Sequence, residues 1–159
     1  MMNRDIEEGF LETGVATMLQ EQCEAPSLNS GCVVCGQENP YGLQLRFKVV
    51  DNASVAQWTA SDGWESFRGV IHGGIICAVL DEAMSQAILS AGYTALTAEI
   101  RVRFRNKVSV NDNLRVRGWI LSVRKRKIVT EGSLTSMDGV EMAHAYATFL
   151  TVRRSFGGY

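Results

Sequence analysis

The sequence predicts an α+β fold in which an antiparallel sheet wraps around one long central helix. Residues 73–90 form a strongly apolar segment with helical spacing near the middle of the chain. Segments on both sides of it alternate apolar and polar residues, which is the period of a half-buried strand. A sheet must cover its apolar face with another element, and only this helix is apolar enough to do so.

The part of the chain before the central helix divides into four predicted segments. A short amphipathic helix is predicted over residues 1–22, and a loop rich in Gly, Asn and Ser over residues 23–42. The stretch LQLRFKVV at 43–50 predicts a strand, and ASVAQWTA at 53–60 its hairpin partner, joined through Asp51 and Asn52. The apolar positions of the first strand are Leu43, Leu45, Phe47 and Val49.

Four strands are predicted after the central helix, and short polar turns connect the last three of them. In the first strand, strict alternation places Leu96 and Ile100 on the core face and Thr97 and Glu99 on the other. The close connections make the sheet largely antiparallel. Its edges and outer face should pair with a second copy of the chain. The predicted strands are 96–105, 114–123, 127–137 and 141–152.

Composition argues against several classes of protein. The formal net charge of −1 gives no overall field for nucleic acid or an anionic membrane. No run approaches the roughly 18 apolar residues of a membrane span. The N-terminal stretch MMNRDIEEGFLETG lacks the layout of a signal peptide. We therefore expect a cytoplasmic protein that binds neither nucleic acid nor membrane.

The chain has four cysteines, and two of them, Cys32 and Cys35, form a C-x-x-C pair. A zinc site needs about four ligands. Cys23 is a possible third ligand, but the only histidines, His72 and His144, are distant in the sequence. The following stretch CGQENPYG indicates a turn, whereas a thioredoxin-like pair opens a helix. We expect structural or incidental thiols and no metal site.

The central helix carries a carboxylate, Asp81, at the border of its core stripe. Burial raises the pKa of such a group and nearby donors lower it, which suits a base or a nucleophile. Asp81 as a solvated flank residue, or as a partner of a neighbouring strand, is an equally open interpretation. On a helical wheel the core stripe consists of Ile76, Leu80, Ala83, Met84 and Ala87.

The helix begins after His72 with two glycines, Gly73 and Gly74. The first N–H groups of a helix carry partial positive charge and can hold an oxyanion or a polarised carbonyl. Asp81 lies eight residues beyond Gly73, about 12 Å along the axis. One subunit can hardly bring both groups to one carbonyl. A symmetric dimer would do so, with one helix supplying the amides and the partner's helix the carboxylate.

Four stretches occur in an order and spacing that resemble a known family. They are CVVCGQENPYGLQLRF, FRGVIHGGIICAVLDEAM, TAEIRVRFR and DGVEMAHAYATFLTV. Together they resemble the hot-dog-fold acyl-CoA thioesterases, in particular the phenylacetic-acid-degradation branch, over about residues 32–152. The resemblance implies a hot-dog domain over residues 32–159, preceded by a helix and loop over residues 1–31. It also implies hydrolysis of an acyl-CoA thioester to a free acid and coenzyme A, without a further cofactor.

The resemblance also implies roles for individual residues and an assembly of two or four chains. Asp81 corresponds to the general base or nucleophile, and the Gly74 amide to the oxyanion donor. The remaining residues would support them: Gly73 allows close approach, His72 positions the substrate, Thr97 orients Asp81 or the attacking water, and Asn39 lines the pocket.

The turn VRKRK is either a solvated hairpin turn or a clamp for the phosphates of coenzyme A. The clamp would use Arg124, Lys125 and Arg126. For the acyl group, we expect a pocket wall that includes Trp58, Trp64, Phe67, Met84 and Tyr93.

Two other functions remain open on the same fold. The first is a non-catalytic binder or sensor of acyl-CoA, although residues 1–22 are too few for a DNA-binding unit. The second is a dehydratase, although dehydratases place their histidine and acid differently. Release of a free thiol from acyl-CoA separates hydrolysis from both.

Overall fold

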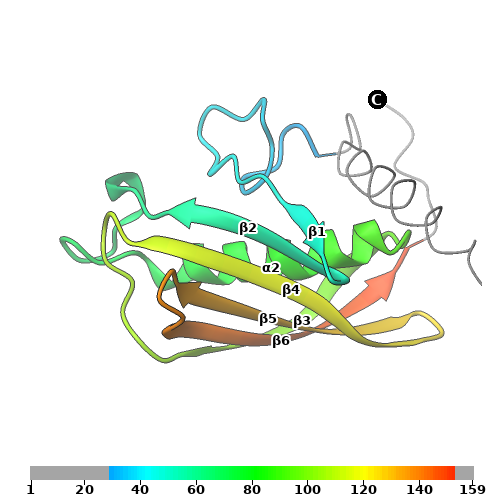
Figure 1. Ribbon diagram of the computed structural model, residues 1–159. Coiled ribbons are helices and arrows are strands. Elements are labelled where there is room, and N and C mark those ends of the chain that lie inside the picture. Colours follow the sequence, from blue (N-terminus) through cyan, green and yellow to red (C-terminus); the bar gives the residue numbers. More distant parts are fainter. Residues whose placement is uncertain (1–28, 153–159) are drawn as a thin grey trace, which may run out of the picture.

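The computed structural model describes residues 29–152. The predicted helix at 1–22 and Cys23 lie outside this range, and the division of the chain at residue 32 stays a prediction. Within the described range the chain forms six strands, one long α-helix and one turn of 3₁₀ helix (Figure 1). The elements are β1 Lys48–Val50, β2 Ala53–Thr59, η1 Asp62–Trp64, α2 Gly73–Ser90, β3 Ala95–Phe104, β4 Asn113–Arg124, β5 Lys127–Ser136 and β6 Glu141–Thr151.

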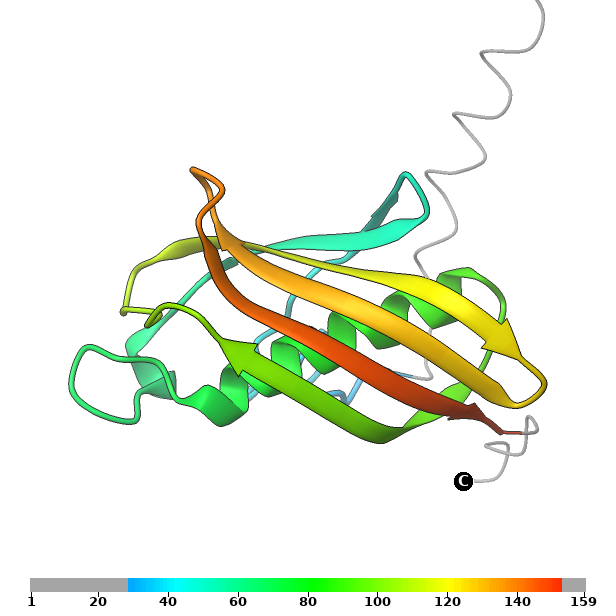
Figure 2. The same cartoon turned by 90° about the horizontal axis from the view of Figure 1, so that it is seen from below.

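All six strands of the described range belong to one antiparallel sheet with the order β1-β2-β4-β5-β6-β3. The sheet curves around α2, which lies along its concave face (Figures 1 and 2). β3 follows α2 in the chain and pairs with β6, so it forms one edge of the sheet. This arrangement is the hot-dog fold, and it confirms the predicted sheet wrapped around a central helix.

Helix α2 has the predicted bounds and supplies the centre of the core. All five residues of its predicted stripe are buried. The helix ends at Ser90, and Gly92 shortly after it has a φ of 84°, a left-handed conformation that glycine adopts without a Cβ clash. By length and mean hydropathy alone α2 would qualify as a membrane-spanning helix, contrary to the expectation that no such run exists. Its buried face against the sheet is that of a core helix.

A row of small residues lets the backbone of α2 lie directly on the sheet. Ser54, Gly118 and Gly132 are paired side by side on β2, β4 and β5. The buried Ser54 hydroxyl donates a hydrogen bond to the Ala83 carbonyl of the helix. A Cβ added to Gly118 would come within 2.5 Å of the Met84 nitrogen. The row therefore sets how closely helix and sheet approach.

The predicted first strand is mostly irregular. Leu45 and Phe47 are buried as expected, but only residues 48–50 pair as β1, and Val49 is exposed. The segment 43–45 instead bonds back to the C-x-x-C turn, through Leu43 N–H to the Val33 carbonyl and Leu45 N–H to the Val34 carbonyl. The hairpin through Asp51 and Asn52 is confirmed, and both residues have positive φ.

Candidate active site

Asp81 and Thr97 meet between the central helix and the edge strand. The Thr97 hydroxyl donates a hydrogen bond of 2.8 Å to the Asp81 Oδ1. Asp81 is half-buried, as its border position on the helix predicts, and Thr97 is exposed. The carboxylate is thus held by a neighbouring strand while one side of the site stays open to solvent.

A β-bulge turns Thr97 toward the helix. The register of β3 against β6 shifts between Thr97 and Glu99, which leaves Ala98 without a partner. Thr97 pairs with Phe149 and Ile100 pairs with Ala147, and both of these partners are buried in the core. Thr97 and Ile100 therefore share the helix-facing side. The strict alternation predicted for 96–105 is wrong at this point because the bulge adds one residue.

The surroundings of Asp81 act on its pKa in opposite directions. Burial raises the pKa of this carboxyl and is the largest influence, the Thr97 hydroxyl lowers it, and the nearby Glu82 raises it further. Burial, together with the charge of Asp81, also raises the pKa of the Cys77 thiol one turn away. Asp81 is therefore a carboxylate in a partly desolvated site, with one hydrogen-bond donor fixing its orientation.

The start of α2 forms a second polar group. His72 is the N-cap residue, and its Nδ1 accepts a 2.8 Å hydrogen bond from the Gly74 N–H. Because Nδ1 is the acceptor, a neutral imidazole carries its proton on Nε2. The exposed ring therefore offers one donor to solvent. The Gly74 amide, predicted as the oxyanion donor, is engaged by the helix cap in this structure.

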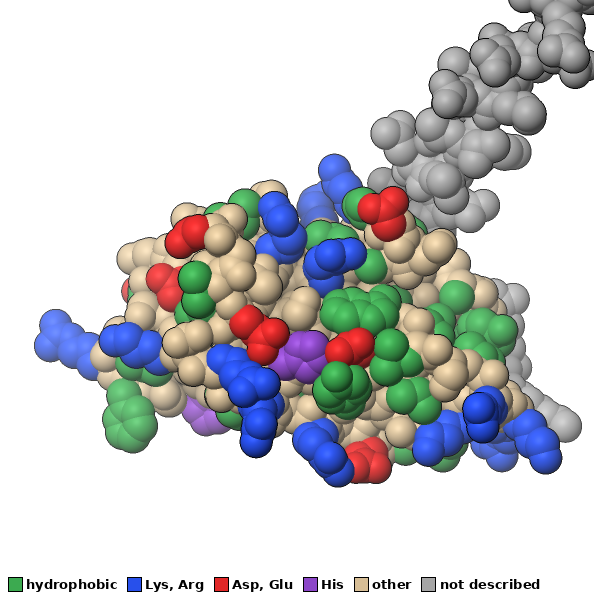
Figure 3. All heavy atoms as spheres, turned by 60° about the horizontal axis from the view of Figure 1, so that its bottom comes forward, with side chains coloured by type: hydrophobic (Ala, Val, Ile, Leu, Met, Phe, Trp, Pro, Cys, Tyr) green, Lys and Arg blue, Asp and Glu red, His purple; other side chains and the backbone are tan. Residues whose placement is uncertain are grey.

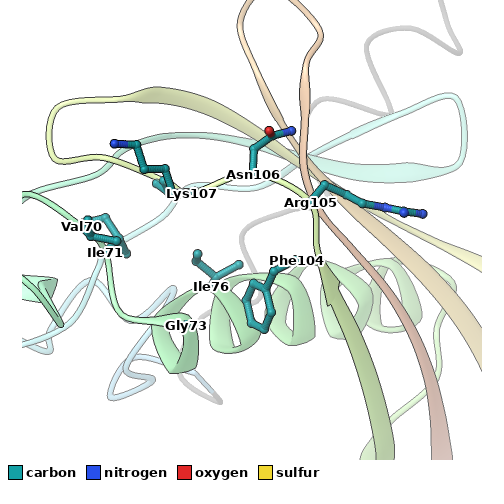
Figure 4. A pocket seen from close by; sticks show the side chains of 9 residues that line it. Val70, Ile71, Gly73, Ile76, Phe104, Arg105, Asn106 and Lys107 are labelled. Carbon is teal, nitrogen blue, oxygen red and sulfur yellow. The ribbon is translucent and has the colours of Figure 1, made fainter.

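The structure does not bring these two groups together within one chain. His72, Gly73 and Gly74 lie at the N-terminus of α2, and Asp81 lies eight residues beyond Gly73 on the same helix. An open hollow of about 340 Å³ adjoins the helix start (Figure 4). Phe104 lies beside the first turn of the helix there, and a Cβ at Gly73 would meet its ring at 3.3 Å. Asp81 does not line this hollow.

The aromatic wall expected for the acyl pocket is not assembled. Trp58 and Met84 are buried in the core at 4% and 0% exposure. Phe67 is 80% exposed and Tyr93 is 40% exposed, while Trp64 is half-buried. None of these five residues lines the hollow beside Gly73. Trp58 and Met84 are core residues in this chain, and the pocket wall stays a prediction.

The basic turn lies at the Thr97 end of the sheet. Ile128, just after the turn, pairs with Phe149, which in turn pairs with Thr97. Two strand spacings correspond to about 10 Å. The Arg126 guanidinium donates hydrogen bonds of 3.3 and 3.4 Å to the Thr151 carbonyl. Arg124 and Lys125 are exposed, and Lys125 occupies the turn with a φ of 53°.

Asn39 serves the loop that contains it. Its side-chain amide donates to the Gly31 carbonyl at 3.1 Å, and its Oδ1 accepts from the Tyr41 N–H at 3.0 Å. Both ends of the amide group thus hold the turn after Cys35 in place. Its role as a pocket residue stays a prediction.

The sequence did not predict two clusters of polar side chains. Next to Asp81, Glu82 reaches the two thiols of the C-x-x-C pair. Burial, followed by the Glu82 and Cys32 side chains, raises the pKa of the Cys35 thiol. On the outer face of the sheet, His144 Nε2 lies 2.8 Å from the Glu131 Oε1. The C-x-x-C spacing signalled the first cluster, but no sequence pattern joins its carboxylate to it.

Comparison with known proteins places this geometry in a family. Residues 68–143 match the family model described as the thioesterase superfamily. This segment contains α2 with Asp81, and β3 with Thr97. It is a thioesterase-superfamily domain. The match to the thioesterase superfamily covers the helix, the edge strand and the strands β4 and β5, which together carry the candidate site. No curated protein matched the sequence.

Solved structures share the fold of this thioesterase-superfamily domain. One described as a thioesterase superfamily protein has a TM-score of 0.72 and 23% identity, covering 86% of this chain and 73% of that one. A hypothetical thioesterase of Streptococcus pneumoniae TIGR4, solved with coenzyme A, has a TM-score of 0.65 and 17% identity over 68% of this chain and 85% of that one. The E. coli PaaI protein of the phenylacetic acid degradation operon has a TM-score of 0.66 and 16% identity over 70% and 81%.

The S. pneumoniae protein was also solved in two mutant forms. One carries alanine in place of an aspartate, and the other carries alanine in place of a threonine sixteen positions further along its chain.

Proposed function

We propose that the protein is an acyl-CoA thioesterase whose active site forms between two subunits. The observation that carries this proposal is the hydrogen bond from Thr97 to Asp81, two residues separated by sixteen positions. The S. pneumoniae hypothetical thioesterase has an aspartate and a threonine at the same separation among its mutated positions. That protein was solved with coenzyme A, which supports a coenzyme A ester as the substrate class.

Asp81 would act in one of two ways. As a general base it takes a proton from water, whose oxygen bonds to the thioester carbonyl carbon as the C–S bond breaks. The proton then passes to the departing sulfur, which gives a free acid and the coenzyme A thiol. As a nucleophile, Asp81 itself attacks the carbonyl and expels the thiolate, and water hydrolyses the resulting anhydride. Both routes balance without a metal or redox cofactor.

Either route forms an oxyanion that needs hydrogen-bond donors. The N-terminus of the helix that carries Asp81 is too far from this residue to supply them. The His72 Nε2 proton and the first amides of α2 are suitable donors. In a two-fold dimer, the helix start of one subunit would lie opposite Asp81 of its partner. The Gly74 amide would exchange its hydrogen bond with His72 for one with the substrate oxygen.

The edge of the sheet supports such pairing. β3 is a ten-residue edge strand, and its Leu96 and Phe104 side chains are 57% and 52% exposed. A long, apolar edge of this kind is an unpaired template for another strand. The neighbouring outer face also exposes hydrophobic side chains beside a histidine and acidic groups (Figure 3). These surfaces suit a dimer and, through the outer face, a dimer of dimers.

Thiol release tests the proposal directly. The full chain is assayed with acyl-CoAs from acetyl to palmitoyl, together with phenylacetyl-CoA and hydroxybenzoyl-CoA. We expect free thiol from at least one substrate, and the preferred acyl group would identify the pocket. Binding of coenzyme A esters without any thiol release would contradict hydrolysis and favour a non-catalytic binder or sensor of acyl-CoA.

The shared site has its own test, because two inactive variants should complement each other. We expect the Asp81→Asn and Gly74→Val dimers each to be inactive. A mixed dimer pairs the intact Asp81 of one chain with the intact helix start of the other. Random exchange of equal amounts should restore about a quarter of the wild-type activity. Mixed dimers verified by mass that stay inactive would show that each site belongs to a single chain.

Thr97 is proposed as a positioning residue for Asp81. Thr97→Val keeps the volume and removes the hydroxyl, so we expect kcat to fall about tenfold with KM little changed. Thr97→Ser keeps the hydroxyl and should retain most of the activity. Steady-state kinetics on both variants check this. Equal losses in the two variants would mean that the methyl group, rather than the hydrogen bond, matters.

The basic turn is proposed to bind the phosphates of coenzyme A. We expect Arg124→Ala with Lys125→Ala to raise KM for the acyl-CoA about fivefold while kcat is unchanged. The matched control is Lys48→Ala, an exposed cation of β1. The corresponding acyl-pantetheine lacks the nucleotide phosphates, so its KM should not change. An equal KM effect on both substrates would overturn the clamp.

A further inference from the structure

The C-x-x-C pair and the central helix form a group of potential metal ligands. The Sγ atoms of Cys32 and Cys35 and a carboxylate oxygen of Glu82 all lie within 4.8 Å of one another. The Cys32 Sγ is 3.4 Å from the Glu82 Oε2, across 50 positions of sequence. All three side chains are half-buried. A loop and the core helix therefore place three ligating groups at one point that solvent can still reach.

The ligand atoms are close to the spacing of a tetrahedral site. Zinc bonds of about 2.3 Å to sulfur and about 2.0 Å to oxygen place the ligands about 3.5–3.8 Å apart. The Cys32–Glu82 pair, at 3.4 Å, is close to the lower end of that range. Small rotations of the Cys35 side chain would close the remaining distance.

The surroundings of the three groups orient them as the outer partners of a metal site do. The Gln86 amide donates to the Glu82 Oε1 at 2.7 Å and lies 3.5 Å from the Cys35 Sγ. The Val34 N–H donates to the Cys32 Sγ at 3.3 Å. Such hydrogen bonds fix ligating carboxylates and support negative charge on sulfur. Gly36 has no room for a Cβ, which would lie 2.5 Å from the Cys32 nitrogen, so the tight turn requires glycine.

The chemistry of the donors selects the ion. Thiolates favour soft or borderline metals over Mg²⁺ and Ca²⁺, and C-x₂-C is a spacing that zinc sites use. A redox disulfide explains the two thiols but not the carboxylate that lies beside them. An anion so placed disfavours thiolates unless a cation balances the charge.

We propose that Cys32, Cys35 and Glu82 bind one Zn²⁺ ion, which fastens the 29–47 loop to α2. The three protein ligands leave a fourth position, for water or another donor. This assignment revises the expectation of no metal site, which rested on the lack of a further ligand near the cysteines in sequence. Glu82 becomes that ligand only through the fold. The proposal does not depend on thioesterase activity.

Metal analysis tests the site without any enzyme assay. The full chain is prepared with reductant and zinc, freed of excess metal, and analysed for zinc by mass spectrometry. We expect about one zinc per chain. Substituted Co²⁺ should show the near-ultraviolet absorption of thiolate ligation. Zinc below a tenth of an equivalent, or a Cys32–Cys35 disulfide in the metal-free protein isolated under reductant, would overturn the proposal.

Single variants locate the ligands. Competition with a chromogenic chelator should show zinc affinity lowered at least about 100-fold in Cys32→Ser or Cys35→Ser and at least about tenfold in Glu82→Gln. Cys77→Ser is the matched control, since Cys77 is a half-buried thiol of the same helix outside the cluster. It should bind zinc like the wild type. Glu82→Gln keeps the side-chain shape, so circular dichroism can separate ligand loss from misfolding. Unchanged affinity in all three ligand variants would contradict the assignment.

Discussion

Replacing Asp81 with asparagine is expected to lower kcat for thioester hydrolysis at least about a thousandfold. Asparagine has the same shape but provides neither a base nor a nucleophile. Its amide oxygen can still accept the Thr97 hydrogen bond that the carboxylate accepts at 2.8 Å. The substitution therefore removes chemistry and leaves the local packing in place. Thiol release at saturating substrate, compared with wild type, measures the effect.

Stability provides the control for this variant. Burial raises the pKa of Asp81, which means that its ionised form is less favourable in the folded protein than in the unfolded chain. The Asp81→Asn variant carries no such charge, so its thermal midpoint at neutral pH should equal or exceed that of the wild type. Asp138→Asn, at an exposed turn, should leave activity unchanged. An Asp81→Asn protein with more than a tenth of wild-type activity would remove Asp81 from the mechanism.

The largest effect on stability is expected from Gly118→Ala. The added Cβ would overlap the backbone of Ala83 and Met84, which belong to the middle of α2. Backbone inside a helix cannot rotate aside as a side chain can, so helix and sheet must separate. We expect the free energy of unfolding to fall by about 3 kcal/mol or more. Urea denaturation at fixed protein concentration measures it.

Gly132→Ala is the matched control on the adjacent strand. A Cβ there would meet the Met84 Cγ and the Arg117 carbonyl at 3.2 Å, and the methionine side chain can adjust. We expect a smaller loss of about 1 kcal/mol. Equal unfolding midpoints for the two variants would show that α2 is free to shift away from the sheet.

The bounds of α2 and of most strands could be predicted because local sequence determines them. The helix at Gly73–Ser90 follows from its apolar stripe, and β4, β5 and β6 follow from alternation and polar turns. The predicted strand at 43–50 was mostly wrong because residues 43–47 alternate like a strand but form hydrogen bonds with the C-x-x-C loop instead. Alternation records which side chains are buried, and it does not identify the partner of the backbone.

The candidate site was only partly predictable for a related reason. Asp81 was found from its place on the helical wheel, whereas the roles of His72 and Thr97 came only from the resemblance to a known family. The contact of Glu82 with Cys32 spans 50 residues and depends on how a loop packs on a helix. Long-range packing of this kind leaves no periodic signal in a single sequence. Trp58 and Met84, expected in the pocket wall, are buried in the core, Met84 on the stripe that the helical wheel predicts.

The bulge in β3 makes the orientation of Thr97 depend on pairing register rather than on composition. Exchanging Ala98 for another residue leaves the bulge in place, so Thr97 still faces the helix. Deleting Ala98 would give regular pairing with Thr97 still opposite Phe149, so the threonine would keep facing the helix; pairing Ala98 without a bulge would instead turn Thr97 to the outer surface. The contact between Asp81 and Thr97 therefore depends on the register that the bulge sets, and the side chain at the bulged position itself is free to vary.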